Sequence, residues 1–182
     1  MHSEPPVFDK NTSLSFLNSA ECFYNCALLF KATDDHRELL KYIPDYKGVC
    51  RPAVYANACR AIELSLKGYL RAAGKTIEDI RKKHGGRYGH DLARLHEACI
   101  TEGLPSLTSD KNLEQFNVLS EHYSGKDFDY PDVQLNQGAP SIGIALDFAK
   151  RAIEAVRTFC RKNDDKHFNT KTASGGFKRK SK

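Results

Sequence analysis

A histidine and a carboxylate stand together at one expected helix start, where His90 is followed by Asp91. A histidine at this position is a titratable group close to free backbone N–H groups, which could meet a phosphate. Four basic residues precede the pair and could add positive charge: Arg81, Lys82, Lys83 and Arg87. The alternative is structural, with Asp91 as the helix cap and His90 as a packing residue that fixes the connection. The residues alone are compatible with both interpretations.

A second polar group follows one face of the helix expected from Pro52 to Ala73, and comprises Arg60, Glu63, Lys67 and Arg71. Glu63 and Lys67 are spaced i,i+4 in the favourable order, which is worth about 0.3–0.5 kcal/mol when the pair is exposed. Charged helix faces are usually solvated, and this is the plain interpretation of the group. The alternative is that Glu63 and Lys67 belong to a binding site.

These side chains must be positioned by helices, because apolar residues recur at three- or four-residue spacing along most of the chain. The expected helices cover residues 12–33, 52–73, 91–102, 109–123 and 140–160, with a single helical turn at 76–80. No segment of useful length alternates with period two, so no sheet is expected. The sequence predicts an all-α protein, an antiparallel bundle of four to five helices. Its expected parts are a flexible lead at 1–11, a helical domain at 12–163 and a basic disordered tail at 164–182.

Composition narrows the class of protein. No run approaches the roughly 18–20 apolar residues of a membrane span, and the N-terminus lacks the basic start and apolar core of a signal peptide. A cytoplasmic protein without membrane contact is expected. The six cysteines form no Cys-x-x-Cys pair with matching histidines, so neither a metal site, nor a disulfide framework, nor any cofactor is predicted.

The net charge of +5 is concentrated at the C-terminal end of the chain. From Arg161 onward there are eight Lys or Arg residues against two Asp, a net charge of +6, which leaves −1 for the rest. The last of these basic residues include Lys178, Arg179 and Lys180, which could contact nucleic-acid phosphates with strong salt dependence. The alternative is a solubilising terminus without a ligand.

Two of these segments resemble the HEPN superfamily, the higher eukaryotes and prokaryotes nucleotide-binding domain. Members carry an Ala-x-Glu-x-x-Leu-Lys-like helix followed by a Gly-His-Asp-Leu-x-x-Leu helix start. The chain has 61-AIELSLKGYL-70 and then 88-YGHDLARL-95, and 130-YP-131 resembles a segment that often precedes the last helix. The resemblance extends roughly from Leu14 to Cys160. It implies a helical bundle, a homodimer, and binding of a nucleotide, RNA or a partner protein in a stress or defence setting.

Many HEPN proteins are metal-independent endoribonucleases that use an Arg followed four to six residues later by His. Arg161 and His167 match this spacing, and His could act as general acid or base while Arg stabilises phosphorane-like charge. Where the family often has Arg before Tyr-Pro, this chain has Asp129, which would repel phosphate. A non-catalytic HEPN-like module is therefore expected. The alternatives are a toxin- or defence-type ribonuclease and a purely structural dimerisation module.

Overall fold

The computed structural model describes residues 12–36, 51–82, 90–128 and 138–174, without the side chains of Asp34, Arg81, Lys82 and residues 160–174. No described residue lies in a strand, so the prediction of an all-α protein is confirmed. The described helices are α1 (Ser13–Asp35), α3 (Arg51–Ala72), α4 (Ile77–Lys82), α5 (Leu92–Thr101), α6 (Asp110–Ser124) and α7 (Ile142–Ser174). None of these helices is both long and apolar enough to cross a membrane.

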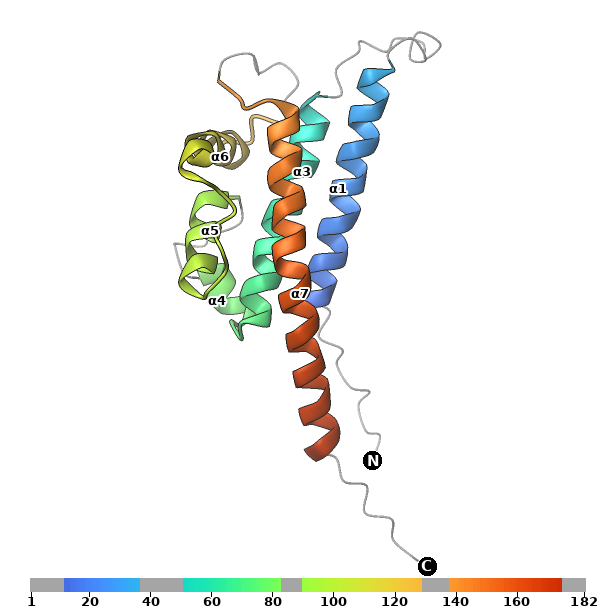
Figure 1. Cartoon of the computed structure of the whole chain (residues 1–182), viewed down its shortest axis with the longest axis vertical. Helices are drawn as coiled ribbons and strands as arrows, with labels where there is room; N and C mark the ends of the chain where they lie inside the picture. The colour runs from blue at the N-terminus through green and yellow to red at the C-terminus, as the bar shows by residue number, and fades with distance from the viewer. Residues whose placement is uncertain (1–11, 37–50, 83–89, 129–137, 175–182) are drawn as a thin grey trace, which may run out of the picture.

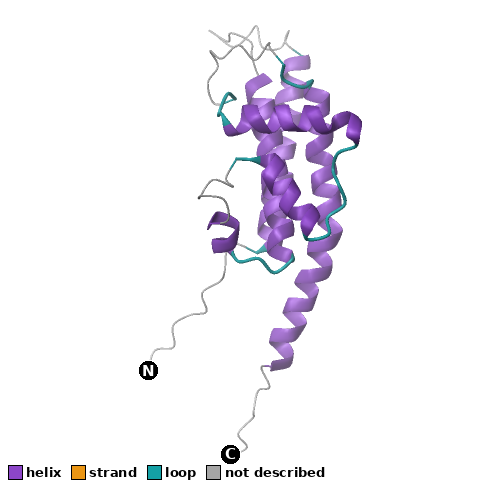
Figure 2. Cartoon of the chain, turned by 90° about the vertical axis from the view of Figure 1, so that its left-hand side faces the viewer, coloured by secondary structure: helices purple, strands orange, loops and turns teal. Residues whose placement is uncertain are grey.

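Three long helices, α1, α3 and α7, lie side by side, and α5 and α6 cover the remaining side of α3 (Figure 1). α6 runs across the long helices, so it is seen nearly end-on in Figure 1 and lengthwise in Figure 2. Because α3 is surrounded, it is the most buried helix, and fifteen of its 22 residues are buried. A charged residue on α3 can therefore lie far from solvent.

The direction of the long helices differs from the predicted antiparallel arrangement. α1 runs opposite to α3, but α3 and α7 run parallel, from top to bottom of Figure 1. The Tyr55 hydroxyl near the start of α3 donates to the Pro140 carbonyl just before α7, and Tyr69 near the end of α3 stacks on Phe159. Through the segment that contains α4, α5 and α6, the chain returns to the end of the bundle at which α3 begins. The antiparallel prediction is thus correct for α1 and α3 and wrong for α3 and α7.

The last helix is longer than the predicted domain. α7 continues to Ser174, so residues 164–174, predicted as the start of a disordered tail, have a helical backbone. Figure 1 shows that this red part of α7 extends beyond the end of the other helices. The prediction ended the helix where the apolar stripe stops, but charged residues also propagate a helix once it has formed.

Local sequence explains where α1 and α5 start. The Thr12 hydroxyl accepts a hydrogen bond from the Ser15 N–H at 3.1 Å, and the Asp91 carboxylate accepts one from the Arg94 N–H at 3.0 Å. Both side chains satisfy backbone donors that a helix start leaves free. Thr12 thus caps the helix expected from residue 12, and Asp91 has the capping role that was one of its two expected interpretations.

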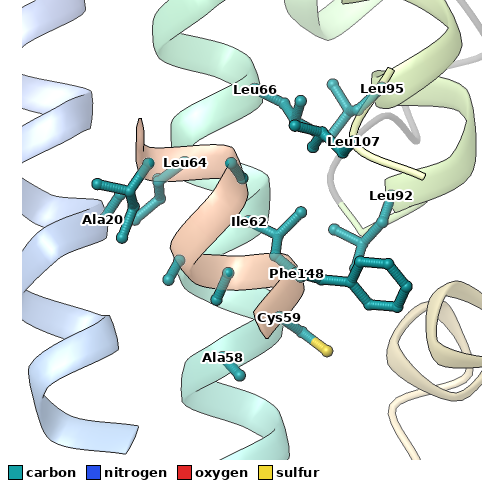
Figure 3. Close-up of a cluster of buried hydrophobic side chains, with 14 of the residues drawn as sticks. Ala20, Ala58, Cys59, Ile62, Leu64, Leu66, Leu92, Leu95, Leu107 and Phe148 are labelled. Carbon is teal, nitrogen blue, oxygen red and sulfur yellow. The ribbon is translucent and has the colours of Figure 1, made fainter. Parts of the chain in front are cut away.

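The core is built around the inward faces of α3 and α7. Figure 3 shows Phe148 of α7 beside Ile62 of α3, with Leu92 of α5 near them and Leu95 of α5 beside Leu107 and beside Leu66 of α3. α1 approaches α3 closely at Gly68, where an added Cβ would lie 3.2 Å from both the Phe16 Cβ and the Ser13 carbonyl oxygen. The tight packing on both sides of α3 fixes the rotation of this helix, and thereby the direction of its polar residues.

Candidate functional site

A buried carboxylate is the centre of the site. Glu63 lies in the middle of α3 and its side chain is 0% exposed, so the interpretation of this helix face as solvated is wrong for Glu63. A buried ionised carboxylate is costly unless other charges and hydrogen-bond donors surround it. The surroundings of Glu63 therefore decide what this region of the molecule can do.

Two cations come from the same helix, at the i−3 and i+4 positions. The Arg60 guanidinium donates from one nitrogen to both carboxylate oxygens of Glu63, at 3.1 Å and 3.0 Å. The Lys67 ammonium donates to the first of these oxygens at 2.5 Å. The predicted pair of Glu63 and Lys67 is present, and Arg60 turns it into a triad.

The other partners come from distant parts of the chain. The Tyr123 hydroxyl of α6 donates to the second oxygen of Glu63 at 2.7 Å, and burial together with the Glu63 charge raises the pKa of Tyr123. Nδ1 of His90 lies 3.4 Å from the same oxygen, and the His90 ring meets the Tyr123 ring edge-on with centroids 5.3 Å apart. The structure thus brings together Glu63, Lys67 and His90, which the sequence analysis placed in two separate groups.

The cluster of Arg60, Glu63, Lys67, His90 and Tyr123, hereafter the Glu63 cluster, carries more positive than negative charge. Two permanent cations face one carboxylate, which leaves a net charge of +1 that rises to +2 when His90 is protonated. The Arg60 and His90 side chains are 39% and 46% exposed. Excess positive charge therefore reaches the surface through these two side chains.

The Arg60 guanidinium also lies over an aromatic ring of α1. The guanidinium carbon lies 6.0 Å from the centroid of the Phe23 ring of α1, at the limit of a cation–π contact. A guanidinium fixed by a carboxylate and a ring loses little side-chain entropy on binding an anion, because its conformation is already restricted. The cluster is suited to recognising a phosphate or carboxylate group.

The start of α5 is partly closed to an anion. Two of its backbone N–H groups already have acceptors, because the Arg94 N–H donates to the Asp91 carboxylate and the Ala93 N–H to the Ser120 hydroxyl at 3.0 Å. Asp91 also forms an ion pair with the Arg94 side chain at 3.1 Å. Asp91 is therefore a helix cap, and these two N–H groups are not available to an anion.

The remaining predicted residues, or their side chains, lie outside the part of the chain that the structure describes. Lys83, Arg87, Lys178, Arg179 and Lys180 lie outside the described residues. Arg161 and His167, the predicted catalytic pair, have their backbone in α7, and their side chains are outside the description. Among the described residues no group of His, Cys, Asp and Glu is arranged to hold a metal ion.

A second pair of a histidine and a carboxylate, His122 and Asp127, lies at the end of α6. Nδ1 of His122 is 2.8 Å from the Asp127 carboxylate, and the His122 ring packs at a tilt on Phe128. The Lys126 N–H donates to the Tyr123 carbonyl and the Asp127 N–H to the His122 carbonyl, which is a Schellman helix end with Lys126 at φ 63°. This helix end, and no ligand, explains why His122 and Asp127 are adjacent.

No protein-family model, curated protein or solved structure matches this chain.

Sequence reasoning missed two members of the Glu63 cluster. Arg60 was noted on the same helix face, and its i−3 spacing from Glu63 was a usable signal. Tyr123 lies at the end of the helix expected at 109–123 and was not singled out, and nothing in the sequence links it to a residue 60 positions earlier. Only the packing of α6 on α3 shows that its hydroxyl meets Glu63.

Proposed function

We propose that this chain is a non-catalytic, HEPN-like helical module that binds a phosphate group of a nucleotide or RNA at the Glu63 cluster. The observation that carries the proposal is the excess of cations around a buried carboxylate, with Arg60 and His90 reaching the surface. Glu63 acts as a positioning residue, and Arg60, Lys67 and His90 supply the charge and the donors for the anion.

Binding fits the geometry better than catalysis. Cleavage of RNA by acid–base chemistry needs one group to accept a proton and another to donate one. Both oxygens of Glu63 already accept from Arg60, Lys67 or Tyr123, and the raised pKa of Tyr123 keeps its proton on the oxygen. His90 is the one histidine of the cluster, and a single imidazole does not make an acid–base pair.

The test is fluorescence anisotropy with two labelled probes, a single-stranded RNA of about 12 nucleotides and ATP. Arg60→Ala and Lys67→Ala should each weaken binding about tenfold, since a charge-assisted hydrogen bond is worth about 1.5 kcal/mol. Lys150→Ala and Arg151→Ala are matched controls, because these cations also lie in i,i+4 ion pairs but on α7. Binding of the RNA alone would indicate that the phosphate belongs to RNA, and binding of both probes would indicate that a nucleotide is sufficient.

A variant with Lys178, Arg179 and Lys180 changed to Ala distinguishes binding at the Glu63 cluster from binding at these C-terminal basic residues. Loss of binding in this variant, with the Arg60 and Lys67 variants unaffected, would contradict the proposal and assign binding to the terminus. Absence of binding at about 50 mM salt would also contradict it. Shortening of the RNA during the measurement would favour the ribonuclease alternative.

A different observation favours self-association as a second role. The most exposed residues of α1 between Leu14 and Phe30 are all uncharged, and comprise Leu14, Asn18, Ser19, Cys22, Asn25, Leu28, Leu29 and Phe30. Four of the six exposed large hydrophobic residues of the described chain lie on this helix. We infer that a second copy of the chain covers this face, because two uncharged faces are self-complementary in a two-fold dimer.

Sedimentation velocity tests the dimer with Leu29→Glu, since Leu29 is 67% exposed and a buried unpaired charge at the seam opposes association. The variant should sediment as a monomer at concentrations where the unaltered chain is a dimer. Leu113→Glu, on α6, is the matched control and should remain a dimer. A monomeric unaltered chain at about 100 μM would refute the role, because the corresponding dissociation free energy is below about 5.5 kcal/mol.

A further inference from the structure

A cavity of about 390 Å³ lies between α5, the segment before α6, and the first two turns of α6. Its residues are separate from the Glu63 cluster. Buried His96 and Phe116 contribute to its lining, and their rings pack with centroids 5.2 Å apart. Ile100 and Leu113, which also line it, are 43% and 45% exposed. Apolar surface therefore surrounds a nearly buried histidine.

The hydrogen bond of His96 determines which ring nitrogen carries the proton. The Leu107 N–H donates to Nε2 of His96 at 2.9 Å, so Nε2 is the acceptor. In the neutral ring the proton is then on Nδ1, which makes Nδ1 a donor. Burial lowers the pKa of His96 and keeps the ring neutral at pH 7.

Nδ1 of His96 has no hydrogen-bond acceptor among the described residues. Nδ1 is nevertheless not fully buried. Among the described residues, Ser65 Oγ is the one side-chain N or O atom that is both fully buried and without a hydrogen-bond partner. The His96 side chain is only 4% exposed, and His96 lines the cavity. The ring thus lines the cavity and carries a donor that is neither paired within the described residues nor fully buried.

The charges around the cavity restrict what can accept this hydrogen bond. Glu97 and Asp110 line it with negative charge, and the positive charge of Arg94 is paired with Asp91 at 3.1 Å. A carboxylate or phosphate would be repelled by the two acidic side chains. A protonated amine has no lone pair with which to accept from Nδ1. A neutral carbonyl oxygen can accept the hydrogen bond from Nδ1 and is not repelled by the two acidic side chains.

We propose that this cavity binds a small uncharged molecule that joins an apolar body to a carbonyl group. The carbonyl oxygen accepts the hydrogen bond from Nδ1 of His96, and the apolar body covers Ile100 and Leu113. The volume lies in the range of small-molecule sites, and an apolar lining with a few placed polar groups is their usual composition. The site does not depend on phosphate binding at the Glu63 cluster.

Three probes of equal size and different charge test the proposal: benzamide, benzoate and benzylammonium. They are titrated into the full chain carrying 13C-labelled Ile and Leu methyl groups and 15N-labelled histidine. Benzamide should shift the methyl signals of Ile100 and Leu113 and the Nδ1 resonance of His96, with a dissociation constant of about 1 mM. Benzoate and benzylammonium should bind about tenfold more weakly or not at all.

Leu113→Asp should weaken benzamide binding about tenfold, because it places a charge at the apolar lining. This residue is exposed, so the variant is expected to fold. Lys150→Asp on α7, which places the same charge at an exposed position away from the cavity and from α1, should bind benzamide as the unaltered chain does. The proposal is overturned if benzamide shifts none of these signals, if the three probes bind equally, or if the nitrogen spectra place the His96 proton on Nε2.

Discussion

The Tyr123 hydroxyl donates a hydrogen bond of 2.7 Å to the buried carboxylate of Glu63, and so joins α6 to the centre of α3. This bond links the small helices to the three long ones at their most strongly charged point. It also closes the inner side of the Glu63 cluster, because the second carboxylate oxygen then has donors from both α3 and α6.

Tyr123→Phe should lower the free energy of unfolding by about 1–2 kcal/mol, since a hydrogen bond to a charged group is lost while the ring remains. Urea unfolding measures this change. Tyr24→Phe on α1 is the matched control, because no described residue forms a hydrogen bond with the Tyr24 hydroxyl, and it should change stability by less than about 0.5 kcal/mol. Equal effects of the two variants would show that the bond to Glu63 contributes nothing.

Glu63→Gln should destabilise the fold by about 2–3 kcal/mol, because it leaves Arg60 and Lys67 without their shared counter-charge. Adding Lys67→Met to Glu63→Gln should recover part of the loss, since the partly buried ammonium is then also removed. Glu154→Gln breaks an exposed ion pair with Lys150 on α7 and should cost less than about 0.5 kcal/mol. Additive effects of the two substitutions, measured by urea unfolding, would disprove the coupling.

Acid should weaken the fold through His96. Burial lowers the pKa of this group below its ordinary value of 6.5, so the unfolded chain binds the proton more readily than the folded one. The contribution of His96 is fully present above about pH 6.5 and is lost as the pH falls through the folded pKa, by at most about 1.4 kcal/mol per pH unit.

An NMR titration of the His96 ring, alongside urea unfolding between about pH 7.5 and 5.5, checks this prediction. The ring titration is needed because urea unfolding alone does not assign the change in stability to His96 rather than to another ionisable group. A His96 midpoint above 6.5 would contradict the prediction.

Lys126→Gly should stabilise the protein by about 0.5–1 kcal/mol. Lys126 has φ 63° in the Schellman end of α6, a conformation that costs a residue with a side chain about 1 kcal/mol and glycine almost nothing. Lys150→Gly within α7 is the opposite control and should destabilise by about 1 kcal/mol. Thermal unfolding of both variants measures the difference, and a less stable Lys126→Gly protein would show that the side chain itself contributes to the fold.

Periodicity and helix caps were enough to predict the helical class and most of its segments. The helices expected from residues 12 and 91 start at the caps Thr12 and Asp91, and α3 ends at Ala72, close to the expected end at residue 73. The direction of α7 was not predictable in this way, because an apolar stripe shows which face is buried but not against which neighbour or in which direction. The length of α7 was missed since its last turns lack that stripe.

The site was predictable only in part, for a similar reason. Glu63, Lys67 and His90 were identified from local spacing and from the family resemblance, and the fold brings them together. The burial of Glu63 could not be inferred, because it results from the packing of α6 and from Tyr123, a residue far away in the sequence. A charged residue in the middle of a helix looks the same in the sequence whether or not another helix covers it.

The parallel arrangement of α3 and α7 has a consequence for the order in which the chain folds. The bond from Tyr55 to Pro140 spans 85 residues and the ion pair of Glu21 with Arg157 spans 136, whereas α1 and α3, which pair in antiparallel directions, lie closer together in the sequence. Loop closure favours the shorter separation, and synthesis from the N-terminus favours the same pair. We expect the α1–α3 hairpin to form first and to expose the inner face of α3 until α7 docks, so that a nascent chain is most prone to aggregate just before its last helix leaves the ribosome.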